Sequence, residues 1–239
     1  MSELFVIGIA AFIIGLSKTS VGGVGIVASV LFAAVMPAKE STAAVLFLLI
    51  SGDLFACYAY RHDVDWRTIA RLAPSVLVGI VAGAWYLGSS SDAGIRKAIG
   101  VVVLMMVALQ LVLRSRPKPT HLPHSITAAT GATAGFTSMV ANAAGAPMAI
   151  YLMNMHISKQ RYLGTTAWFF FALNVTKMPF SIQLGLLHAD RVLQLLWFVP
   201  VVAAGAWVGR RLVHRISMDA LQILILAAAF VGGLNLFLR

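Results

Sequence analysis

Two short polar interruptions of apolar sequence carry the residues best suited to bind an anion. The first, residues 15–25, combines one lysine with hydroxyls and glycines. Glycines let backbone N–H groups approach a ligand, and a helix that begins after such a turn offers unpaired donors and a partial positive charge. Because the lysine adds a full charge, the stretch predicts an anion site; a lysine snorkelling from a helix end is the alternative. Its candidate ligands are Ser17, Lys18, Thr19, Ser20, Gly22 and Gly23.

The second interruption, residues 135–147, has no charged residue. It offers the hydroxyls of Thr137 and Ser138 and the amide of Asn142, and Pro147 stands where a new helix can start. We expect these three polar side chains to bind the same anion from the other side. Packing of helices through small residues is the alternative.

Two ionisable residues lie deep in apolar runs. Asp53 lies within the run 41–60, and Lys177 follows Asn174 by three positions in the run 162–183, so both lie on one helix face. Ionisable groups inside a membrane are costly and mark function by default. We expect Asn174 and Lys177 to complete the anion site and Asp53 to couple a proton or cation. The alternative is that Asp53 forms a structural ion pair with Lys18 or Lys177.

Composition identifies the elements that must position these residues. Of the 239 residues 60% are hydrophobic and 11% are charged, with a mean hydropathy of +0.89. Soluble domains are far less apolar, so the chain is predicted to be an all-α integral membrane protein. The formal net charge of +10 lies between apolar runs, as in cytoplasmic loops, which argues against a nucleic-acid partner. The single cysteine closes no intramolecular disulfide, and the start Met-Ser-Glu is not typical of a cleaved signal.

The apolar runs form two similar halves. The recurring features, at a near-constant spacing, are Gly15 and Gly25 with Gly135 and Gly145, Lys39-Glu40 with Lys159-Gln160, Asp53 with Asn174, and Pro74, Gly79 and Gly83 with Pro200, Gly205 and Gly209. Paired breaks in two repeats are typical of secondary transporters. We therefore expect inverted-topology repeats over residues 1–113 and 125–239, joined by a cytoplasmic linker, 114–124. Each repeat would start with a short broken or re-entrant helix pair followed by three spanning helices, giving about eight to ten hydrophobic segments.

The expected runs are Leu4–Leu16, Val21–Val35, Ser41–Tyr60, Leu72–Gly88, Ala98–Leu113, Ile126–Phe136, Ala146–Met155, Tyr162–Gln183, Val192–Gly209 and Asp219–Leu238. With an inverted arrangement most loop lysines and arginines fall on one face of the membrane, as the positive-inside rule requires. This predicts a multi-pass protein of the cell (inner or plasma) membrane with both termini outside. A homo-oligomer is compatible with the sequence.

Enzyme signatures are missing from the sequence. The six histidines lie in loops or at the ends of runs, and none forms a close metal-binding pair with a carboxylate. No nucleophile elbow, phosphate-binding loop or cysteine pair occurs. We expect no catalytic residue, no metal and no cofactor, and a small anion and the lipid bilayer as partners. An anion channel on the same fold, or a membrane-embedded enzyme acting on a lipid or phosphate, stays as the alternative.

These motifs resemble the TauE/SafE family, the sulfite exporter and sulfonate permease group. The resemblance covers nearly the whole chain and rests on GLSKTSVGGVGIVASVLF, MVANAAGAPMAIYLM, YLGTTAWFFFALNVTKMPFS and GDLFACYAYRHDVDW. It implies transport of small sulfur-containing or organic anions such as sulfite, sulfonates or thiosulfate. Commoner members have no lysine in the first interruption and a proline soon after it, where this chain has Lys18 and Ala28-Ser29. A built-in positive charge suits a permanently ionised ligand such as a sulfonate or carboxylate.

Overall fold

The described part of the chain is helical throughout, as so apolar a sequence predicts. The computed structural model describes residues 3–20, 25–114, 123–153, 155, 157–187, 189–212, 227, 230–231, 234–235 and 237–238; these contain no strand. The helices are α1 (Glu3–Thr19), α2 (Gly25–Val35), α3 (Ala38–Ala59), α4 (Trp66–Ser89), α5 (Asp92–Arg114), α6 (His124–Ala141), α7 (Gly145–Met153), α8 (Lys159–Gln183), α9 (Ala189–Leu196) and α10 (Val199–Leu212).

Two helices meet the length and hydropathy of a membrane span within the described residues, α3 and α4. The α9–α10 pair meets them jointly, with a bend of 50° between its members. The sequence predicts one apolar segment over Val192–Gly209, whereas the structure bends it between α9 and α10. The chain turns at Trp197 and Phe198, and Pro200 near the start of α10 has no N–H with which to continue the helix from α9.

Both interruptions begin later than the sequence predicted. Ser17, Lys18 and Thr19 belong to the last turn of α1 rather than to a break. The Thr19 hydroxyl donates to the carbonyl of Gly15 and the Ser20 hydroxyl to that of Leu16, so side chains satisfy the carbonyls of the last turn. In the second half α6 continues through Gly135 to Ala141. Its break is confined to the residues between Ala141 and Gly145.

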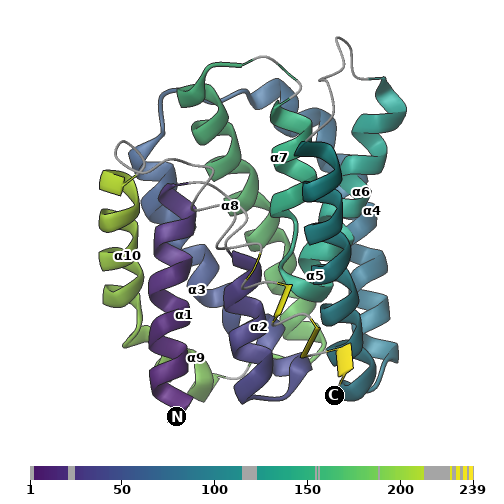
Figure 1. Ribbon diagram of the computed structural model, residues 1–239, viewed down its shortest axis with the longest axis vertical. Helices are drawn as coiled ribbons and strands as arrows, with labels where there is room; N and C mark the ends of the chain where they lie inside the picture. The colour runs from purple at the N-terminus through teal and green to yellow at the C-terminus, as the bar shows by residue number, and fades with distance from the viewer. Residues whose placement is uncertain are drawn as a thin grey trace.

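Two helix pairs flank the centre of the molecule. Helices α1 and α10 lie side by side on one flank, α4 and α6 pack together on the other, and α3 and α8 run between them (Figure 1). The two pairs make the same kind of close contact. Gly15 lies against the backbone of Val202 and Ala206, while Gly135 lies against that of Val76 and Ile80. Small residues thus let the helix backbones approach closely.

The glycine contacts give a prediction about stability. A Cβ added at Gly15 would lie 2.7 Å from the Ala206 amide nitrogen, whereas one added at Gly8 on the same helix would first meet a Phe198 ring carbon at 3.6 Å. Overpacking costs about 1–3 kcal/mol, and alanine in a helix is favoured over glycine by roughly 1 kcal/mol. Gly15→Ala should therefore lower the melting temperature of the purified protein in detergent, while Gly8→Ala should not. Equal melting temperatures for the two variants would contradict the close contact.

Some predicted features lie largely or wholly outside the described residues. They are the segment expected at Asp219–Leu238, most of the 114–124 linker, and Gly22 and Gly23.

Candidate functional site

The site starts where the two central helices touch. Asp53 of α3 is fully buried, and the Asn174 amide of α8 donates to its carboxylate oxygen Oδ2 at 2.7 Å. These are the two positions that the sequence paired as equivalents in the two halves. Their contact joins the halves at the centre of the molecule.

Lys18 holds the other oxygen of this carboxylate. Its Nζ lies 2.6 Å from Asp53 Oδ1, and its side chain is 10% exposed. The ammonium also lies 4.8 Å from the centre of the Phe170 ring, a cation–π arrangement. Gly52 makes room for the lysine, because a Cβ there would stand 3.1 Å from Lys18 Cγ. Asp53 thus pairs with Lys18 rather than with Lys177.

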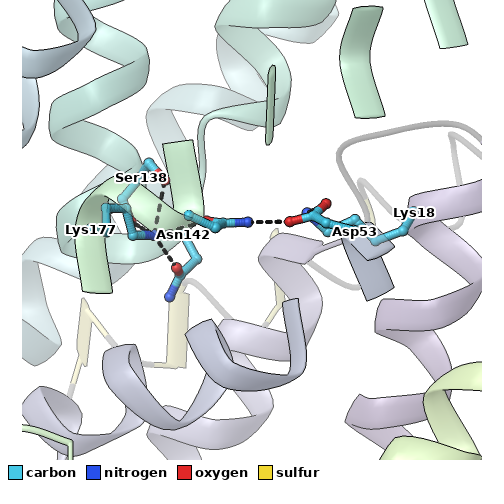
Figure 2. Close-up of polar contacts among 6 residues, drawn as sticks. Lys18, Asp53, Ser138, Asn142 and Lys177 are labelled. Carbon is cyan, nitrogen blue, oxygen red and sulfur yellow. Dashed lines mark hydrogen bonds and ion pairs between the residues drawn. The ribbon is translucent and has the colours of Figure 1, made fainter. Parts of the chain in front are cut away.

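Lys177 lies at the opposite end of the network (Figure 2). Its Nζ donates to Asn142 Oδ1 at 2.6 Å and to the backbone carbonyl and hydroxyl oxygens of Ser138 at 2.9 and 3.0 Å. A longer contact of 3.4 Å reaches Asn174 Oδ1. The side chain is 1% exposed. All of these acceptors are neutral.

The end of α6 presents two of these acceptors. Asn142 adopts the left-handed conformation, with φ 51° and ψ 35°, which asparagine tolerates better than most residues. The amides of Asn142 and Ala143 then donate to the carbonyls of Ser138 and Thr137, which closes the helix. Asn142 also donates from its side chain to the Thr42 carbonyl of α3 at 3.2 Å. The turn therefore fixes the amide with its oxygen toward Lys177.

The network has more positive than negative charge. Its described members include two ammonium groups, Lys18 and Lys177, and one carboxylate, Asp53. Asp53 contacts Lys18 directly and Lys177 only through Asn174. A buried charge without a counter-ion is expensive. Among the described lysines of the network, Lys177 is the one with no carboxylate in direct contact.

The hydroxyls of other predicted ligands donate to backbone carbonyls. The Thr19 hydroxyl donates to Ala206 at 2.7 Å as well as to Gly15, and that of Thr137 donates to Thr133 at 2.7 Å. Tyr60 lies over the end of α1 and its hydroxyl donates to the Thr19 carbonyl at 2.7 Å. Ser17 is buried in α1. The structure thus brings together six predicted residues, namely Lys18, Asp53, Ser138, Asn142, Asn174 and Lys177.

Three residues at the site were not predicted from the sequence. Phe170 is one of 13 phenylalanines, and Thr42 contributes only a backbone carbonyl, so neither carries a distinguishing signal. Gly52 directly precedes Asp53 in the sequence, and this neighbourhood is the signal by which it could have been found. Within the described residues no group of three histidines, cysteines, aspartates or glutamates is placed to hold a metal ion.

Apolar helices around a buried, positively charged network define a helical membrane protein with a polar interior. The family model described as sulfite exporter TauE/SafE matches residues 7–236. The chain therefore belongs to the TauE/SafE sulfite exporter family, and with its apolar helices it is a membrane-embedded transporter. No curated protein and no solved structure matches it.

Proposed function

We propose that the protein is a secondary transporter of small organic or sulfur-containing anions, of the sulfite, sulfonate or thiosulfate class. The observation that carries this proposal is the buried ammonium of Lys177, which is surrounded by neutral oxygens. An anion would supply the missing negative charge. Ser138 and Asn142 would then offer their O–H and N–H groups to the anion.

The proposed mechanism is alternating access between two inverted repeats, residues 1–113 and 125–239. It is supported by the matched contacts of Gly15 with α10 and Gly135 with α4, which link each repeat to the other. Each flanking pair therefore contains one helix from each repeat. We propose that the α1–α10 pair and the α4–α6 pair rock about α3 and α8. Since Lys177 is 1% exposed, the anion reaches it only when these helices separate.

The proposed orientation places the protein in the cell membrane as a multi-pass protein with both termini outside. The two ends of the chain marked in Figure 1 lie at the same end of its long axis. This placement agrees with the distribution of basic residues between the predicted loops.

Flux into proteoliposomes tests the proposed function. The panel consists of sulfite, thiosulfate, sulfoacetate, taurine, lactate and sulfate, each with and without a pH gradient, beside protein-free vesicles. Saturable flux of a sulfur oxyanion or sulfonate is the expected result. Flux of lactate alone would keep the site and change the substrate class. Folded protein that moves none of these anions would refute the proposal.

We further propose that Asp53 carries the coupled proton, because it is the carboxylic acid of the network. Asp53→Asn should still pass anions downhill but should lose accumulation driven by a pH gradient. With one proton per anion the wild-type protein should accumulate about tenfold per pH unit, since one unit is worth about 1.4 kcal/mol. Glu40→Gln, a neutralised acid elsewhere on α3, is the matched control. An Asp53→Asn protein that accumulates anion as well as this control would exclude the coupling role.

A further inference from the structure

The two halves of the network differ by one atom at the position where they meet. Asp53 and Asn174 occupy equivalent places in the repeats, touch each other, and each contacts one lysine. The order through the site is Lys18, Asp53, Asn174, Lys177. Aspartate and asparagine have the same shape, so the halves differ here mainly in charge.

This arrangement makes the Asp53 carboxylate equivalent to a bound anion. It lies 2.6 Å from the Lys18 ammonium, a distance typical of a charge-assisted contact. The corresponding side chain in the other half, Asn174, presents only a neutral oxygen to Lys177 at 3.4 Å. Lys18 thus already contacts an anion that belongs to the protein, and Lys177 does not.

We propose that the acid–amide pair at positions 53 and 174 selects which lysine binds the transported anion. A carboxylate fills the anion position beside its lysine, and an amide leaves its lysine with neutral acceptors only. Lys18 is then a second anion site that Asp53 keeps closed. This inference rests on the proposed role of Lys177. Lys18 is also the more accessible lysine, at 10% exposure, so an anion reaches it readily once the carboxylate is neutralised.

The decisive test is a rescue. Lys177→Met leaves only the self-paired Lys18 and Asp53, so it should carry no anion. Adding Asp53→Asn frees Lys18 in the same protein. Downhill uptake of radiolabelled sulfite and sulfoacetate, without a pH gradient, should rise by roughly tenfold or more from the single to the double variant. A further Lys18→Met change should abolish the regained flux.

Two comparisons make the rescue specific. Glu40→Gln in the Lys177→Met background removes a negative charge from α3 away from the network and should restore nothing. Asn174→Asp places a carboxylate beside Lys177 and replaces the amide that donates to Asp53 by an oxygen. Because an ammonium flanks each of the two acids, we expect the carboxylates to move apart and each to pair with its own lysine, so flux should fall to that of protein-free vesicles. If the double variant does not fold, Asn174→Asp alone tests the selection by positions 53 and 174.

The outcomes separate this inference from the proposed function. A wild-type protein without anion flux would refute the proposed function itself. Wild-type flux that depends on Lys177, combined with a folded but inactive Lys177→Met/Asp53→Asn protein, would refute only the selection by positions 53 and 174. Wild-type flux in Asn174→Asp, or rescue by Glu40→Gln, would refute it as well.

Discussion

Lys177→Met is expected to abolish saturable anion flux while leaving a folded protein. Methionine has a similar length and no charge, so the change removes the ammonium without opening a large cavity. The oxygens of Ser138, Asn142 and Asn174 lose a donor, which costs stability, but the buried charge disappears with it. The two effects oppose each other, and we expect a melting temperature close to that of the wild type.

The measurement is initial uptake of sulfite or sulfoacetate into proteoliposomes at matched protein content. Lys97→Met, the same change at an exposed lysine of α5, is the control and should transport as the wild type does. If Lys177→Met keeps the wild-type rate and apparent affinity, the ammonium is a structural group and the anion site lies elsewhere.

The chemistry of the site was largely predictable, because ionisable residues in apolar helices are rare. Asp53 and Lys177 stood out for this reason alone. The spacing of Asn174 and Lys177 predicted that these two residues share a face of α8, and their 3.4 Å contact confirms it. The comparison of the halves paired Asp53 with Asn174 before any geometry was known. Pairing in sequence does not predict contact in space, so the hydrogen bond between them is new information from the structure.

The ends of the helices were the least predictable feature. Polar residues and glycines at 15–20 and 135–141 indicated breaks, yet residues 15–19 and 135–141 are helical. Part of the reason is local, because the hydroxyls of Thr19 and Thr137 donate to backbone carbonyls of the preceding turn. The other part is tertiary, because Gly15 and Gly135 pack against neighbouring helices and Thr19 also donates to Ala206. The sequence shows where the glycines and hydroxyls recur, but it does not show which distant backbone each of them contacts.

The same limit explains why the role of Lys18 stayed open. Its position in the first interruption favoured direct anion binding, while a pair with Asp53 was the competing interpretation. Which of two buried lysines contacts one acid depends on side-chain distances that spacing does not encode. The 2.6 Å contact assigns the carboxylate to Lys18 and leaves Lys177 with neutral acceptors.

Lys18→Met alone should therefore be the most destabilising change in the network. It leaves the Asp53 carboxylate fully buried with only the Asn174 amide beside it. Removing one partner of a buried ion pair costs about 3–5 kcal/mol, since the remaining charge is desolvated without compensation. We expect a marked fall in the melting temperature in detergent and a loss of the monodisperse peak on size exclusion.

Neutralising both partners should reverse most of this loss. In Lys18→Met/Asp53→Asn no unpaired charge remains, and exchange of a buried ion pair for neutral groups of similar volume is often neutral or stabilising. The double variant should thus melt well above Lys18→Met, although it carries one more substitution. Combining Lys18→Met with Glu40→Gln provides the control, because that acid lies outside the network. If the double variant melts no higher than this control, charge pairing with Asp53 is not what holds Lys18, and its contact with the Phe170 ring becomes the dominant interaction.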